Sequence, residues 1–215
     1  MKPPVVSRLP RLALLSGLAF ALGAAGCTSM FQAKPDLTRF YLLSAPAVAR
    51  QPADSPKART ATIGICRVEL PAYLRTPAVI LRPGGTEMRA ATDARWGEPL
   101  DLGIARVLRE TLQAQPGVRS VIVYPAPQVS PPAYELAVHV LACEGVTDTG
   151  GAQARFTATW ELRATAASAE TAVLAAGAFE APSGSWSDGD YGALTARLGE
   201  SVAALGREVA AALPE

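Results

Sequence analysis

An uncharged apolar run near the amino terminus, Leu12–Gly26, is the feature that most constrains how the rest of the chain folds. Three basic residues precede it, Lys2, Arg8 and Arg11, and it ends in small residues before Cys27. A basic start, a short apolar run and small residues before a break are the layout of a secretory signal. The run has about 15 residues, fewer than the ~20 that a membrane-spanning helix needs. The pattern predicts an exported chain whose folded part begins after this run.

The end of the run resembles the lipobox of bacterial lipoproteins, in which a cysteine thiol receives a diacylglycerol before the signal is cleaved. Small side chains at Ala25 and Gly26 let a peptidase reach the backbone before Cys27, whereas Ala24 departs from the leucine usual at that position. We expect a lipoprotein signal peptide at 1–26, and diacylglycerol and an N-acyl chain such as palmitate on Cys27 as the only non-protein groups. The alternative is a plain signal peptide with an incidental cysteine.

The chain after the signal has the size of one domain. Residues 27–36 are interpreted as a lipidated amino terminus and tether, and 37–215 as a single α/β periplasmic domain. Thr28 stands where an Asp is associated with inner-membrane retention in enteric bacteria, which favours the outer membrane. The whole chain has 20 Lys and Arg against 19 Asp and Glu, so its charge gives no argument for a nucleic-acid partner. No second apolar run approaches the length of a membrane span.

Two further cysteines, Cys66 and Cys143, follow the signal. Their spacing is not that of a metal site, and the chain has one histidine, so no metal is expected. An oxidising compartment permits a disulfide between them. Free cysteine is among the most buried residue types, which favours two buried thiols, but both alternatives stay open.

Apolar periodicity predicts an alternation of strands and two helices. The first helix begins at Glu98 and Pro99 and ends before Gly117, and the second covers about 191–213 with Asp188 or Asp190 as its cap. The first helix carries one apolar stripe, formed by Leu100, Ile104, Val107, Leu108 and Leu112. The predicted strands are 37–43, 61–70, 78–82, 118–124, 134–144, 154–163 and 172–180. The near-continuous apolar run at 118–124 indicates an interior strand, and 145–151 is predicted to be a turn.

The residues that could carry chemistry have simpler structural explanations. His139 lies mid-strand without a Ser or Asp in a catalytic spacing, so a packed or hydrogen-bonded histidine is favoured over a general base. Glu98 and Asp101 suit the positive end of a helix better than a catalytic pair. Asp188 and Asp190 lack the rest of a calcium loop. The sequence therefore predicts no enzyme.

Large apolar side chains occur in predicted loops at Pro71–Leu74 and at Arg95–Trp96, where such groups mark contacts with other molecules. Trp96 looks exposed in this pattern. The alternative is that Tyr73 and Trp96 fold back onto the edge of the domain.

Three stretches resemble the PqiC/YmbA-type auxiliary lipoproteins of ABC-type intermembrane lipid transport. They are TRFYLL at 38–43, IGICRVELPAYLRTPAVILR at 63–82 and RWGEPLDLGIARVLRETL at 95–112. The pair LP-x-YL and RW-x-EPL, in this order after a lipobox, is specific to that family. Ala24 and Cys66 are departures from its pattern.

The resemblance implies a three-layer α/β domain with two main helices against a mixed β-sheet, similar to anticodon-binding domains. It also implies a non-catalytic subunit at the periplasmic face of the outer membrane. Its partners would be an MCE-domain protein and inner-membrane transporter components, and copies would assemble into a ring. In that family the MCE-domain protein forms a conduit for lipid. The resemblance therefore implies that this protein docks the end of the conduit and supports the integrity of the membrane.

Six residues are predicted to contact the partner. They are Pro71, Tyr73, Leu74, Arg75, Arg95 and Trp96. Two alternatives remain: a direct periplasmic lipid carrier with its own apolar cavity, and an envelope scaffold or regulatory lipoprotein.

Overall fold

The computed structural model describes residues 35–44, 60–126, 131–165 and 172–214. The signal, Cys27 and most of the tether lie outside these ranges. All the helices and strands named below belong to one compact unit, Thr38–Glu215.

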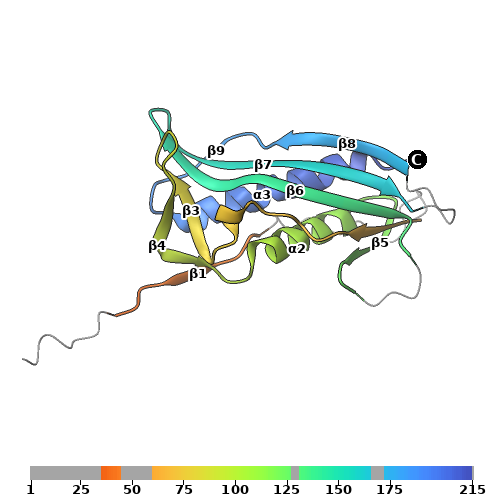
Figure 1. The fold of residues 1–215 in the computed structure, drawn as a ribbon, viewed down its shortest axis with the longest axis horizontal. Helices are drawn as coiled ribbons and strands as arrows, with labels where there is room; N and C mark the ends of the chain where they lie inside the picture. Colours follow the sequence, from red (N-terminus) through yellow and green to blue (C-terminus); the bar gives the residue numbers. More distant parts are fainter. Residues whose placement is uncertain (1–34, 45–59, 127–130, 166–171, 215) are drawn as a thin grey trace, which may run out of the picture. The chain divides into compact units, whose positions relative to one another are not determined.

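The longest element is an antiparallel hairpin of β6 (Tyr134–Asp148) and β7 (Gly151–Ala164), visible in Figure 1. Strands β8 (Ala172–Glu180) and β9 (Gly184–Ser185) both pair with the other edge of β7. The period-2 pattern predicted for β7 is confirmed, because its inward-facing residues are all buried. These are Ala154, Phe156, Ala158, Trp160 and Leu162.

The opposite edge of β6 is shared by two strands that both run parallel to it. β2 (Ala61–Ile65) pairs with the start of β6, and β3 (Ala78–Arg82) pairs near its end. Beyond β2 lies β5 (Val118–Val123), also parallel. Beyond β3 lie the antiparallel β4 (Arg89–Trp96) and then the parallel β1 (Arg39–Tyr41). The described residues thus form one mixed sheet of nine strands.

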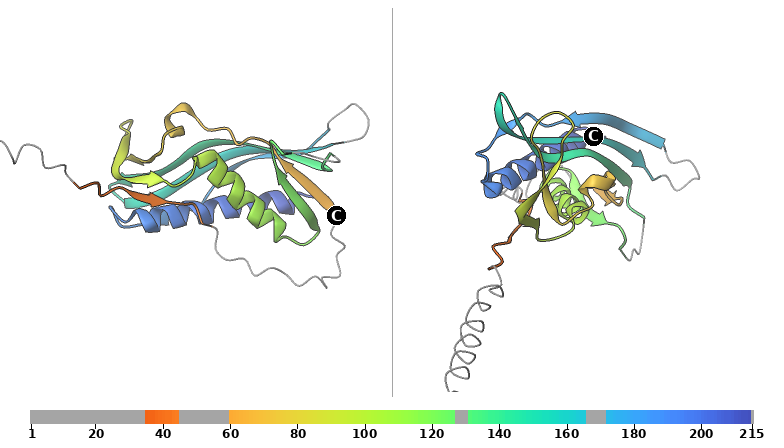
Figure 2. Two further views of the ribbon diagram at one scale, coloured as in Figure 1. Left: turned by 90° about the horizontal axis from the view of Figure 1, so that it is seen from below. Right: turned by 60° about the vertical axis from the view of Figure 1, so that its left-hand side comes forward.

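Two helices, α2 (Leu100–Gln113) and α3 (Tyr191–Ala211), lie side by side against one face of this sheet (Figure 2). The apolar stripe predicted for α2 is buried at every position. Asp190 caps α3, because its Oδ1 accepts a hydrogen bond from the Ala193 N–H at 3.0 Å. The predicted α/β class, with a mixed sheet and two main helices, is confirmed.

Four predictions about the strands are wrong. Arg95 and Trp96, expected in a loop, form the end of strand β4. The strand expected at 61–70 ends at Ile65. The turn expected over 145–151 is largely strand, since β6 runs to Asp148. The interior position expected for β5 is an edge position among the described residues. Of the strands described, only β2 pairs with β5, and the apolar residues of β5 pack against α2. An apolar run indicates burial, and here a helix supplies that burial in place of a second neighbouring strand.

A bulge between Val140 and Ala142 changes which side chains of β6 face the helices. After it, Cys143 and Gly145 lie on the helix side opposite Phe156 and Ala154 of β7. The thiols of Cys66, half-buried, and Cys143, buried, are both free.

Candidate functional site

β2 and β3 pair with the same edge of β6, and a groove opens at the segment that connects them. The chain here still follows β6, since the Glu69 N–H donates to Val138 O at 3.0 Å and Glu69 O accepts from the Val140 N–H at 2.9 Å. It then departs through the short 3₁₀ helix η2 (Ala72–Leu74) before returning as β3. The connection from β4 to α2 stands opposite η2, and the two segments enclose the groove.

The groove has a volume of about 790 Å³. It is lined by Arg67, Val68, Glu69, Leu70, Leu74, Arg75, Thr76, Pro77, Trp96, Gly97, Glu98, Pro99, Leu100 and Asp101. Its buried lining is apolar and includes Leu74, Trp96 and Leu100. Its exposed lining carries charge: the Arg67 guanidinium, 85% exposed, lies 3.7 Å from the Asp101 carboxylate. An apolar floor with a charged rim is the usual make-up of a protein contact site.

The corner of the chain that contains η2, residues 70–75, is held by hydrogen bonds within itself. The Leu74 N–H donates to Pro71 O at 3.0 Å, which closes the 3₁₀ turn. The Arg75 Nε donates to Leu70 O at 3.0 Å. The exposed Arg75 side chain is thereby held at the groove rim while its charge stays in solvent.

Tyr73 belongs to the same corner, but its side chain reaches β6. Its hydroxyl donates to Leu141 O at 3.1 Å. The pKa of Tyr73 is raised above its ordinary value, mainly by burial of the side chain and, to a smaller extent, by the nearby Glu144 carboxylate. Glu144 is fully buried and accepts a hydrogen bond from the Arg82 Nε at 2.7 Å. Tyr73 therefore fastens η2 to β6 beside a buried ion pair.

Trp96 is buried, with 7% of its surface exposed, so the expectation of an exposed indole is wrong. Its backbone N–H donates to Pro77 O at 2.7 Å, which joins the two walls of the groove. The next N–H, of Gly97, donates to Tyr41 O of β1 at 2.8 Å. Trp96 thus supports the groove floor from within the core.

The structure brings three of the six predicted contact residues together, since Leu74, Arg75 and Trp96 line the groove. Pro71 precedes η2 at its edge. Arg95 lies outside the lining and donates from its Nη1 to Ala91 O of its own strand at 2.7 Å.

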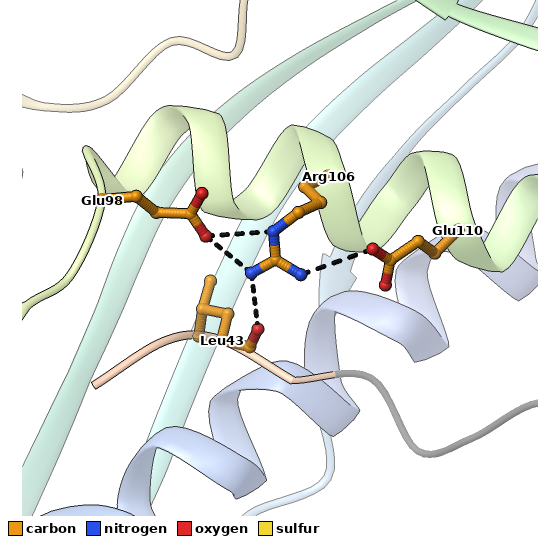
Figure 3. Close-up of polar contacts among 4 residues, drawn as sticks. All are labelled: Leu43, Glu98, Arg106 and Glu110. Atoms are coloured by element: carbon orange, nitrogen blue, oxygen red, sulfur yellow. Dashed lines mark hydrogen bonds and ion pairs between the residues drawn. The ribbon is translucent and has the colours of Figure 1, made fainter. Parts of the chain in front are cut away.

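Arg106 lies in the stretch 95–112 that carries the family resemblance, but no role was predicted for it from the sequence. Figure 3 shows its guanidinium between Glu98 at the groove and Glu110, with the carbonyl oxygen of Leu43, just after β1, below it. Its Nη2 lies 2.6 Å from Glu98 Oε1 and donates to Leu43 O at 2.8 Å, and its Nη1 lies 3.5 Å from Glu110 Oε1. The hydrogen bond to Glu98 raises the pKa of Arg106. The position of Arg106 in the matched helix motif was the only available signal.

His139 does not take part in the groove. Its Nδ1 lies 3.0 Å from Glu69 Oε2, and both side chains are exposed on the surface of the sheet. Over the described residues, no group of three or more His, Cys, Asp or Glu side chains is placed to hold a metal ion. Nor does either helix described here combine the length and apolar character needed to cross a bilayer.

Two solved structures share this fold. An uncharacterized protein is 18% identical, with a TM-score of 0.61 over 81% of this chain and 97% of that one. Protein XCC0632 from Xanthomonas campestris is 16% identical, with a TM-score of 0.62 over 80% of this chain and 92% of that one. None of the curated proteins matches the sequence.

The family model for the ABC-type transport auxiliary lipoprotein component matches residues 41–210. This range includes both walls of the groove, Arg106 and all of the sheet beyond β1. The chain therefore belongs to the family of ABC-type transport auxiliary lipoproteins.

Proposed function

We propose that this protein is a non-catalytic lipoprotein that docks an MCE-domain protein of an ABC-type intermembrane lipid transport system. Lipidated Cys27 would hold it at the periplasmic face of the outer membrane, and the groove would receive the partner. Inner-membrane transporter components would complete the system. The family supports the auxiliary role, whereas the MCE partner, the membrane and the groove as docking site are parts of the proposal.

The observation that carries the proposal is the groove itself. Both sequence motifs that carry the resemblance contribute to it, from segments more than 20 residues apart in the chain. Its walls are joined by the bond from Trp96 N–H to Pro77 O, so the opening is a fixed feature of the domain. A preformed apolar floor lowers the entropic cost of binding an apolar side chain of a partner.

Capture of the co-expressed MCE-domain protein by the full lipidated chain tests this assignment. Arg67→Glu combined with Arg75→Glu reverses two exposed charges at the rim and should reduce capture at least tenfold. Arg207→Glu, an exposed arginine of α3 that lies outside the groove lining, is the matched control and should capture normally. Equal capture by both variants would remove the groove from the interface, and no capture by the wild type, even with a crosslinker, would refute the MCE partner.

Anchoring is tested separately at Cys27, which lies outside the described residues. Cys27→Ser should abolish incorporation of labelled palmitate and release the protein from the outer-membrane fraction. Unchanged acylation and fractionation would overturn the anchor. The ring implied by the resemblance is not needed for docking. The native mass of the detergent-extracted protein would give the number of copies in such a ring.

The apolar floor of the groove also supports a second candidate function, in which the protein itself carries lipid. A groove of this volume is of the size that small-molecule sites have. Native mass spectrometry of the purified protein separates the two functions, because a carrier would retain phospholipid and a docking subunit would not.

A further inference from the structure

One stretch inside the sheet has a strand on one side only. Residues 66–70 continue β2 along β6, which covers their inner side. On the outer side β5 stops beside β2, at the bond from the Tyr124 N–H to Ile65 O, and β4 lies beside β3, which begins at Ala78. Among the described strands none pairs with the outer side of 66–70. Figure 1 shows β5 at one end of this stretch and β4 at the other, and the groove lies between them.

The backbone of this stretch presents unpaired hydrogen-bonding groups to the groove. The N–H and C=O of Glu69 both bond to β6, so those of Val68 and Leu70 point the other way, because successive residues of an extended chain alternate. The Leu70 carbonyl shows this direction, since it accepts from the Arg75 Nε of the η2 corner. Within the described residues, the Val68 N–H, the Val68 C=O and the Leu70 N–H have no hydrogen-bond partner.

These unpaired groups belong to buried residues that line the groove. Val68 and Leu70 are 3% and 8% exposed, whereas the Glu69 side chain between them is 65% exposed. This alternation is that of an extended strand with one covered face. The great majority of buried backbone polar groups in proteins are paired, and an open strand edge is a template for another chain. Three such groups in one groove therefore favour an extended occupant.

The rest of the groove lining suits the side chains of such an occupant. A strand laid against 66–70 would point alternate side chains toward the helices, where an apolar one would contact Leu74, Trp96 and Leu100. At the rim, Arg75 is bonded only through its Nε within the described residues, which leaves its two outer nitrogens to bind a carboxylate. Backbone, floor and rim are thus complementary to an extended segment with an apolar and an acidic side chain.

We propose that an extended segment of the docking partner joins the sheet here as a strand paired with residues 66–70. Its backbone bonds to Val68 and Leu70, one apolar side chain lies on the groove floor, and a carboxylate binds Arg75. This inference rests on the proposed docking function and adds the way in which the partner is held. A helix of the partner would leave the three backbone groups unpaired, because its own backbone groups bond within the helix.

Amide hydrogen exchange of the full lipidated chain, alone and bound to the co-expressed MCE-domain protein, tests the pairing. The Val68 and Leu70 amides should exchange rapidly in the free protein and at least tenfold more slowly in the complex. The Glu69 amide, bonded to Val138 O, is the internal control and should be protected in both states. A complex in which Val68 and Leu70 exchange as in the free protein would overturn the strand and leave the docking function standing.

Proline substitution separates backbone pairing from burial of the groove. Val68→Pro removes the outward N–H without removing a bond within the described residues, and an unchanged melting temperature checks the fold. Capture of the MCE-domain protein should fall about tenfold, because a carbonyl of the partner loses its donor. Gly192→Pro, in the first turn of α3 and outside the groove lining, is the matched control and should capture normally. Equal capture by the two variants would overturn the proposal.

Proline scanning of the partner gives a result that does not depend on the fold of this chain. A photo-crosslinking amino acid in place of the exposed Arg67 identifies the bound segment by mass spectrometry. Prolines introduced one at a time along that segment should weaken capture at alternate positions, because every second N–H of a strand faces its neighbour. Equal loss at every position, as in a helix, or no loss would refute the strand alone. No capture of the MCE-domain protein by the wild type would refute the docking function itself.

Discussion

Arg106 holds Glu98 through two donors that converge on one carboxylate oxygen, with Nη2 at 2.6 Å and Nε at 3.1 Å from Oε1. The same Nη2 also donates to Leu43 O. One guanidinium therefore ties Glu98 of the groove wall to the segment just after β1. A lysine has a single ammonium group and cannot reproduce this planar arrangement.

Arg106→Ala should lower the free energy of unfolding by about 2 kcal/mol, since it removes hydrogen bonds to a carboxylate and to a partly buried carbonyl. Arg106→Lys should recover less than half of that loss. Chemical denaturation of the purified protein measures both. Arg109→Ala, on the exposed side of the same helix, is the control and should change stability by less than about 0.5 kcal/mol. An equal effect at Arg109 would show that Arg106 acts through helix propensity alone.

Trp96→Ala should destabilise the domain by about 3 to 5 kcal/mol, the usual cost of removing a buried aromatic side chain. Trp96→Phe should cost less, because most of the packed volume remains. Thermal unfolding followed by circular dichroism is the measurement. A Trp96→Ala variant that keeps the melting temperature of the wild type would contradict the core position assigned to this indole.

Glu144→Ala should cost about 3 kcal/mol, because it leaves the Arg82 guanidinium without its buried partner. Replacing the pair together, as Arg82→Met with Glu144→Leu, should recover much of that stability. Denaturation of Arg82→Met, of Glu144→Leu and of the double variant gives the coupling energy. Additive losses in this cycle would mean that the two side chains do not depend on each other.

Both thiols should react slowly with iodoacetamide in the folded protein. Burial raises the pKa of Cys143 to about 12, and burial together with the Glu135 carboxylate raises the pKa of Cys66. A raised pKa means less of the reactive thiolate at pH 8. Mass spectrometry should find Cys143 unlabelled and half-buried Cys66 labelled slowly, with both labelled at once in guanidinium. Rapid labelling of native Cys143 would be inconsistent with its burial.

Gly199→Ala should destabilise the contact between α3 and the chain that follows β1. A Cβ at Gly199 would overlap the Ser44 carbonyl oxygen and lie 2.8 Å from the Ser44 nitrogen. Backbone cannot move aside as a flexible side chain can, so a loss of about 1 to 3 kcal/mol is expected. Gly192→Ala, exposed at the start of the same helix, should be neutral or stabilising by comparison of melting temperatures.

The helices and strands predicted best from the sequence are those whose buried residues recur at a regular spacing within a single segment. The stripe of α2 and the alternation of β7 each repeat with a fixed period against a single covering surface, so the period identifies both element and face. The bulge at Val140–Ala142 could not be predicted this way, because it depends on the register with β7. The edge position of β5 likewise depends on which helix covers it.

The sequence singled out the two segments that line the groove, but not how their side chains lie. The two motifs around Leu74 and Trp96 do meet in space, although no periodicity links them. Their residue types suggested surface contact, yet the Trp96 indole packs inward, since a large apolar ring gains more by burial than by exposure. Arg106 was missed because Arg106 itself and its partners Glu98 and Leu43 come from three separate segments, which only tertiary structure brings together.

The first strand has a mechanical consequence for a protein held by its amino-terminal end. β1 would receive any tension before the rest of the domain does, and would pass it on through its pairing with β4, through Tyr41 O and, just after the strand, through Leu43 O. The Gly97 N–H, which donates to Tyr41 O, belongs to the wall opposite η2. The Arg106 guanidinium, which donates to Leu43 O, holds Glu98 of that wall. A pull from the membrane and a load from a bound partner would therefore be borne by the same few hydrogen bonds.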